Sequence, residues 1–273
     1  MEETMSFQAQ CLSVNTTSKK SIVIGPGAII GKDVVIGEGT KIGAHAMIAG
    51  RTIIGNNCII HPHAAIAAGP FDSQHAKENL VIIGDNTQIR EFVTINGSTE
   101  KGLKTQIGSH CLISAYSQID SNCIIGDFVV LSNAVKLAAH AEVENRAVIG
   151  GLAIIHPFIK IGRSAMIGGI SKIIHDVPPF ILVNGNPAQA FGINLIGMRR
   201  AGISENKRRI IKKAYKILYL PGLSVASALE VMEEQLVLCE ELKYFMDFLR
   251  SNNREICGKG KAYKSKLRST QVN

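Results

Sequence analysis

The sequence has no tryptophan, and aromatic residues make up only 5% of its 273 residues although 46% are apolar. A core with so few rings suits a narrow prism of Ile, Val and Ala better than a thick sandwich. No apolar run approaches the roughly twenty residues that span a bilayer. The first residues, MEETMSFQAQCLS, lack the basic leader and apolar run of a secretory signal. We therefore expect no membrane span.

An aliphatic residue instead recurs every six positions, without a gap, from residue 107 to residue 173. Six is the period of neither a helix nor a strand, so it indicates a repeat architecture. We predict a mostly β fold, a left-handed parallel β-helix in which each hexad supplies a short strand and a turn and three hexads close one triangular coil. The left-handed winding follows the pattern of hexapeptide-repeat proteins, against the usual crossover preference. Residues eighteen apart should then lie on one face, about 4.8 Å apart.

The fourth residue after each aliphatic one is nearly always small or β-branched, and should fill the prism beside it. Cys58, Cys111 and Cys123 occupy such positions, where cysteine behaves as a small hydrophobe. The six cysteines show neither a disulfide framework nor metal-ligand spacing. We therefore expect reduced thiols, a cytoplasmic location, and no bound metal or cofactor.

The repeat first appears at Ile24, and residues 1–20 are expected to form an irregular cap, because terminal repeats are atypical. Two insertions, residues 68–80 and 96–106, interrupt the hexads. Loops inserted into a regular solenoid are where binding groups concentrate. The β-helix domain is predicted to span residues 1–190.

A C-terminal α-helical domain is predicted over residues 191–273. Residues 183–202 read as a Gly- and Asn-rich connector. Three helices should follow, one after the N-cap Ser204, one after the N-cap Ser224, and one from residue 240 to residue 252. The tail after Ile256 is basic and is predicted to be disordered.

The net charge of +8 lies entirely in this C-terminal part. From Phe191 onward there are 16 Lys and Arg against 8 Asp and Glu, which leaves 14 of each sign before it. A basic helical surface of this kind favours an acidic partner.

Several segments resemble the UDP-N-acetylglucosamine 3-O-acyltransferases that open lipid A biosynthesis. They are IREFVTINGST, LSNAVKLAAHAEV, AVIGGLAIIHPF, DVPPFILVNGNPAQAFGIN, NLIGMRRAGIS and FLRSNNREIC, and the resemblance covers roughly residues 22–257. It implies transfer of a 3-hydroxyacyl chain from acyl carrier protein to the 3-hydroxyl of UDP-N-acetylglucosamine. It also implies a homotrimer with sites in the clefts between neighbouring β-helices. No nucleic-acid partner is expected.

Attack of a sugar hydroxyl on a thioester needs a general base and a donor for the developing oxyanion. The family's base is a histidine in the motif AHxAHDC, and the corresponding segment here is YSQIDSNC. The resemblance therefore places Ser121 at the base position and Gln118 at the accompanying histidine. A serine hydroxyl is too weak a base to replace imidazole, so we expect much reduced activity. Asp120, an alternate residue along the chain, should point away.

Other family positions are kept. His140 matches the histidine of the family's LAGHV segment, and Ala139 holds the position whose backbone N–H serves the oxyanion. His156 matches the histidine of VHQF, a substrate contact. The eighteen-residue register places Ser121, His140 and His156 on neighbouring coils of one face, near one another but not superimposed.

The resemblance implies further substrate contacts. In the first insertion Asp72 is kept, whereas Gln74 stands where a substrate-binding lysine is expected. Asn194 and Arg200 match positions for the nucleotide-sugar, and arginine suits a diphosphate. Gly169 occupies the position that sets acyl-chain length, and its missing side chain implies a longer acyl group.

Two alternatives stay open. One is a catalytically impaired homologue that trimerises and still binds nucleotide-sugar or carrier protein. The other is a trimeric hexapeptide enzyme with zinc between subunits, for which His61, His63, His110 and His140 are the candidate ligands. Their spacing repeats no ligand set, and the helical tail argues against this reading.

Overall fold

The computed structural model describes residues 15–16, 21–68, 79–98, 100–251 and 254–260. Asp72 and Gln74, most of the predicted cap and the last thirteen residues of the basic tail lie outside these residues. Within the described chain, no helix is both long and apolar enough to cross a membrane.

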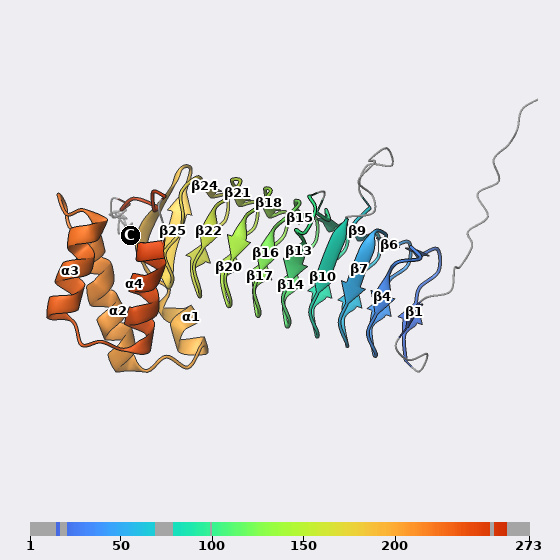
Figure 1. The fold of residues 1–273 in the computed structure, drawn as a ribbon, viewed down its shortest axis with the longest axis horizontal. Helices are drawn as coiled ribbons and strands as arrows, with labels where there is room; N and C mark the ends of the chain where they lie inside the picture. The colour runs from blue at the N-terminus through green and yellow to red at the C-terminus, as the bar shows by residue number, and fades with distance from the viewer. Residues whose placement is uncertain (1–14, 17–20, 69–78, 99, 252–253, 261–273) are drawn as a thin grey trace, which may run out of the picture.

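Three parallel sheets form the faces of an elongated triangular prism, with the helices gathered at one end (Figure 1). Sheet A consists of β1 (Asn15–Thr16), β4 (Val35–Ile36), β7 (Arg51–Ile54), β10 (Leu80–Ile83), β13 (Thr105–Ile107), β16 (Ile124–Ile125), β19 (Glu142–Val143) and β22 (Lys160–Ile161). Sheet B consists of β2 (Val23–Ile24), β5 (Lys41–Ile42), β8 (Ile59–Ile60), β11 (Gln88–Ile89), β14 (Leu112–Ile113), β17 (Val130–Leu131), β20 (Val148–Ile149), β23 (Met166–Ile167), β25 (Ile181–Gly185) and β26 (Ala188–Ile193). Sheet C consists of β3 (Ile29–Ile30), β6 (Met47–Ile48), β9 (Ala65–Ile66), β12 (Thr94–Ile95), β15 (Gln118–Ile119), β18 (Lys136–Leu137), β21 (Ile154–Ile155) and β24 (Lys172–Ile173).

The hexad pattern is confirmed as the origin of the core. From residue 107 to residue 173 every aliphatic repeat position is at most 1% exposed, and every small position after it is at most 6% exposed. Residues eighteen apart pair between neighbouring coils, as Gln118 does with Lys136. Cys58, Cys111 and Cys123 are buried in the prism as expected.

The chain turns at three corners in each coil, and the corners position the loops. The corner that leads from sheet C to sheet A, here called the C–A corner, carries both insertions and the turns around Asn122, His140 and Phe158. These three residues adopt the left-handed conformation, with φ of 64°, 60° and 62°. The strands extend slightly into the predicted insertions, because Leu80 begins β10 and Thr105 begins β13.

The predicted connector over residues 183–202 is wrong, because this segment has regular structure. Strands β25 and β26 form an antiparallel hairpin that extends sheet B, and α1 (Leu195–Arg200) follows it. Val183, Ala188 and Ala190 are buried, so alternating small apolar residues hold the hairpin on the end of the prism. The division predicted at residue 190 falls inside β26.

The three later helices are confirmed. They are α2 (Glu205–Leu218), α3 (Val225–Gln235) and α4 (Glu240–Ser251). Ser204 and Ser224 are the N-caps of α2 and α3, and the Ser224 side chain accepts a hydrogen bond from Ser227 N. The prediction of disorder is wrong for the residues just after Ile256, because Cys257 N donates to Asp176 O at 2.9 Å and Ala190 N donates to Gly258 O at 2.7 Å.

Candidate active site

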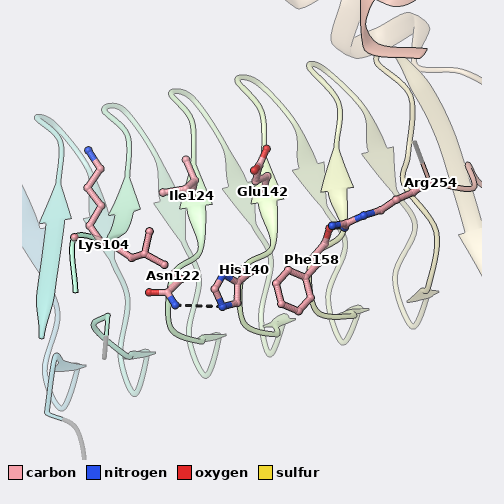
Figure 2. Close-up of a pocket in the computed structure, with 9 residues that line it drawn as sticks. Lys104, Asn122, Ile124, His140, Glu142, Phe158 and Arg254 are labelled. Carbon is pink, nitrogen blue, oxygen red and sulfur yellow. Dashed lines mark hydrogen bonds between the residues drawn. The ribbon is translucent and has the colours of Figure 1, made fainter. Parts of the chain in front are cut away.

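A cavity of about 340 Å³ opens at the C–A corner (Figure 2). Its floor comes from the turns of three successive coils, one wall comes from the outer face of sheet A, and the second insertion and the C-terminal segment complete the rim. The lining residues in that order are Asn122, His140 and Phe158, then Ile124 and Glu142, and then Gly102, Leu103, Lys104 and Arg254.

His140 is the central polar side chain of this cavity. Its ring stacks on Phe158 with the centroids 4.5 Å apart, and Figure 2 shows it between Asn122 and Phe158 along the corner. Its Nε2 lies 3.1 Å from Glu100 Oε1 and 3.3 Å from Asn122 Nδ2. The imidazole is therefore fixed by stacking on one face and by polar partners at one nitrogen.

Asn122 links the second insertion to the C–A corner through hydrogen bonds. Its Nδ2 donates to Glu100 Oε1 at 2.7 Å, and its own backbone N–H donates to Thr105 Oγ1 at 3.0 Å. The residue is only 7% exposed. Its Oδ1 is buried and has no hydrogen-bond partner among the described residues.

Ser121 lies beside His140 as the register predicts. His140 N donates to Ser121 O at 3.0 Å, so the two residues lie on adjacent coils. Asp120 is held elsewhere: its Oδ1 accepts from Ser121 N at 2.9 Å and from Asn96 Nδ2 at 3.1 Å.

Three further predicted residues lie around the same corner. Ala139 precedes His140, and its backbone N–H has no acceptor among the residues described. His156 is on the next coil, where its N–H donates to Ile173 O at 3.0 Å. Gln118 is partly buried in β15. The chain therefore brings Ser121, Ala139 and His140 together at the corner. His156 begins the same corner on the next coil, Gln118 lies in the strand before the corner, and of these five residues His140 lines the cavity.

Gly169 lies at another corner. It is exposed in the turn that leads from sheet B to sheet C, here called the B–C corner, at the opposite edge of sheet C from His140. A Cβ built on it would lie 3.2 Å from Gly151 O. One chain alone therefore does not place Gly169 beside His140.

Asn194 and Arg200 stand at the two ends of α1, which lies at the helical end of the molecule (Figure 1). Asn194 is 9% exposed and caps α1, since its Oδ1 accepts from Gly197 N and its Nδ2 donates to Ser164 O, each at 2.9 Å. Arg200 is exposed at the end of α1.

The candidate zinc ligands are spread over three corners. His61 and His63 lie at the B–C corner, His110 lies at the corner between sheets A and B, and His140 lies at the C–A corner. His61 Nδ1 is 3.1 Å from Glu91 Oε1. No three His, Cys, Asp or Glu side chains of the described chain are grouped closely enough to hold a metal ion.

Sequence reasoning missed Glu100, Asn122 and Arg254. Asn122 could have been found, because it precedes His140 by one coil of eighteen residues. Glu100 comes from the second insertion and Arg254 from the segment after α4. Neither segment follows the eighteen-residue repeat, so the sequence does not indicate that these residues lie near the C–A corner. Arg254 Nη1 donates to Phe158 O, which fixes the segment after α4 at the rim of the cavity.

Comparisons with known proteins agree on one family. A sequence profile described as Udp N-acetylglucosamine O-acyltransferase, Domain 2, matches residues 176–257. A second profile, described as Bacterial transferase hexapeptide (six repeats), matches residues 20–50 and 33–68.

Individual proteins extend these matches along the chain. The acyl-[acyl-carrier-protein]–UDP-N-acetylglucosamine O-acyltransferase of Anaeromyxobacter sp. (strain Fw109-5) is 40% identical over 199 residues, which are 72% of this chain and 77% of that protein. The enzyme of the same name from Gloeothece citriformis is 42% identical over 171 residues, so the chain spans 62% of that relative's length.

Solved structures match over more of the chain. LpxA from Acinetobacter baumannii superposes with a TM-score of 0.79 at 35% identity, over 89% of this chain and 97% of that one. The UDP-N-acetylglucosamine acyltransferase of Francisella novicida gives a TM-score of 0.80 at 32% identity, over 94% of this chain and 98% of that one.

Proposed function

The chain belongs to the family of acyl-[acyl-carrier-protein]–UDP-N-acetylglucosamine O-acyltransferases, and we propose that it catalyses the first step of lipid A biosynthesis. It transfers a 3-hydroxyacyl chain from acyl carrier protein to the 3-hydroxyl of UDP-N-acetylglucosamine. The observation that supports this proposal is the cavity at the C–A corner, which His140 lines. Ala139 precedes His140, and Ser121 accepts a hydrogen bond from its backbone.

The helical end supports docking of the carrier protein. Lys212, Lys213 and Lys216 are exposed on α2, whereas Ile211 and Ala214 on the same helix are buried. Acyl carrier protein is acidic, and complementary charge speeds such encounters. Asn194 and Arg200 lie at the same end of the molecule, and we propose that they contact the nucleotide-sugar there. The exposed Arg200 is available to bind the diphosphate.

We also propose a homotrimer, because the predicted site residues lie at the two edges of sheet C. At the B–C corner Phe92, Tyr116, Leu152 and Ile170 are 47%, 64%, 59% and 74% exposed, and they occupy equivalent positions on neighbouring coils, with Ala134 on the coil between Tyr116 and Leu152. An exposed apolar row of this kind is typical of an interface. A second copy covering it would close a groove across sheet C in which Gly169 could limit the acyl chain.

The position of Ser121 favours a second candidate function, an impaired homologue that binds these substrates without rapid turnover. Loss of a general base typically costs on the order of 100- to 10,000-fold in rate. The two candidates differ in turnover and not in binding, so both quantities must be measured.

The test is an assay of the purified chain with UDP-N-acetylglucosamine and 3-hydroxyacyl carrier protein, with the acylated sugar detected by mass spectrometry. We expect slow product formation that rises in Ser121→His and is unchanged in Ser121→Ala. Binding of the nucleotide-sugar without product would support the impaired homologue. Failure to bind either substrate would contradict both candidates.

We further propose a cytoplasmic location and a functional division near residue 190. The location is supported by the free thiols of the described cysteines, Cys58, Cys111, Cys123, Cys239 and Cys257. The division is supported by the helices, which all begin after β26.

A further inference from the structure

The second insertion brings a carboxylate to His140 that no repeat position could supply. Glu100 Oε1 lies 3.1 Å from His140 Nε2 and accepts a hydrogen bond of 2.7 Å from Asn122 Nδ2. Asn122 Nδ2 is in turn 3.3 Å from the same imidazole nitrogen. Glu100, Asn122 and His140 therefore form a closed polar cluster at the edge of the cavity.

We propose that His140 is the general base of the acyl transfer and that Glu100 is the residue that positions it, an inference that rests on the proposed function. When Nε2–H donates to the carboxylate, Nδ1 carries the lone pair and is the basic nitrogen of the ring. A carboxylate that orients an imidazole in this way also stabilises the imidazolium that forms during the reaction.

The surroundings of His140 fit this role. Its ring is held against Phe158, 4.5 Å between centroids, and its side chain is 27% exposed, so it is fixed and still accessible from the cavity. Its backbone is hydrogen-bonded to residue 121, the position assigned to the family's base. A sugar hydroxyl placed for that position would therefore lie close to His140.

The other acids near the cavity are less suited to act as a base. Both bonds to Asp120 Oδ1 hold that carboxylate on the backbone of Ser121 and on Asn96. Glu142 lies with its Oε2 3.7 Å from Lys160 Nζ on the outer face of sheet A. Neither is coupled to an imidazole.

The step balances without any further reactant. The oxygen of the sugar 3-hydroxyl forms a bond to the thioester carbonyl carbon while its proton moves to His140 Nδ1. The negative charge on the carbonyl oxygen is met by the N–H of Ala139. The C–S bond then breaks, and the carrier thiolate leaves with the proton returned by the imidazolium.

Steady-state kinetics of the full chain test the proposal. We expect His140→Asn to lower kcat on the order of 100- to 10,000-fold, and Glu100→Gln to lower kcat by about 10-fold or more with KM for UDP-N-acetylglucosamine unchanged. The double variant should be no slower than His140→Asn alone, because the two side chains act as one unit. In a Ser121→His background, the loss caused by Glu100→Gln should disappear.

Glu91→Gln is the matched control, since Glu91 forms a carboxylate–imidazole pair of the same 3.1 Å length with His61 at the B–C corner. It should leave kcat unchanged, and thermal melting should show that each variant folds. A Glu100→Gln effect on KM alone, additive losses in the double variant, or wild-type kcat in His140→Asn would overturn the proposal.

Two outcomes separate this inference from the proposed function. If the unmodified chain binds UDP-N-acetylglucosamine but gives no product, His140 is not a working base and only the binding function stands. If it neither binds nor turns over, the proposed function fails as well.

Discussion

The hydroxyl of Tyr244 on α4 donates a hydrogen bond of 2.6 Å to Glu144 Oε2, one hundred positions earlier in the β-helix. The same oxygen accepts from Arg163 N at 2.8 Å, and the Arg163 guanidinium lies 4.1 Å from the centre of the Tyr244 ring. Burial, and then the bond to the Glu144 carboxylate, raises the pKa of Tyr244 above its usual range. This contact joins the helical region to the prism.

Tyr244→Phe should therefore weaken the attachment of α4 without disturbing the ring contacts. It leaves Glu144 one donor short, and a hydrogen bond to a charged group contributes about 1.5–3 kcal/mol. We expect a loss of that size in the free energy of unfolding by urea. Val237→Ala trims a side chain that is 76% exposed between α3 and α4 and is the control, which should match the wild type. Equal stability of the two variants would contradict a stabilising role for the hydrogen bond between Tyr244 and Glu144.

The buried thiols predict a loss of stability at alkaline pH. Burial raises the pKa of Cys123 from 9.0 to about 12 and that of Cys111 to about 11. Because the folded-state pKa lies above the unfolded value, this stabilisation is complete below pH 9 and is lost as the pH rises toward the folded-state pKa. Each such thiol should cost about 1.4 kcal/mol per pH unit in that window.

Cys123→Ala should consequently lose about 1.4 kcal/mol less than the wild type between pH 8 and pH 10. The measurement is urea unfolding at both pH values. The smaller side chain lowers the free energy of unfolding equally at both, so this cost drops out of the difference between them. Ser117→Ala changes a buried side chain at the same repeat position that does not titrate, and it should keep the wild-type slope. If the free energy of unfolding of Cys123→Ala fell with pH as steeply as that of the wild type, ionisation of this thiol would not be the cause of the loss of stability at alkaline pH.

If the exposed apolar row at the B–C corner forms the trimer interface, a charged side chain placed in this row should dissociate the trimer. Tyr116→Asp and Leu152→Asp would each place an unpaired carboxylate in a closed interface, which costs several kcal/mol. We expect the wild type to sediment as a trimer and both variants to shift toward single chains. Val237→Asp changes an apolar side chain that is even more exposed, 76%, between α3 and α4, and this variant should stay trimeric. Unchanged sedimentation of all three variants would exclude this corner from the interface.

The prism could be predicted because its interior imposes the hexad on every coil: a missing Ile or an enlarged Ala would disturb both neighbours. The cluster of Glu100, Asn122 and His140 could not, since its carboxylate depends on the path of an insertion without a repeat. The β25–β26 hairpin could not be predicted either, because Gly and Asn residues such as Asn184 and Gly185 are typical of a connector, whereas the small apolar residues around them pack on the end of the prism.

Gly169 predicts the selectivity for acyl-chain length. Its turn is exposed at the B–C corner, and an added Cβ would lie 3.2 Å from Gly151 O, so a larger side chain must extend away from Gly151. We expect that side chain to enter the proposed acyl groove. Gly169→Met should shorten the preferred acyl chain. Each methylene excluded from an apolar groove forfeits about 0.8 kcal/mol, about a fourfold change in kcat/KM. Carrier-bound acyl chains that differ by two carbons should therefore change their kcat/KM ratio by about 16-fold, with Gly169→Ala intermediate. A uniform loss for both chain lengths would instead place Gly169 outside the acyl groove, because a residue that only supports the turn cannot distinguish chain lengths.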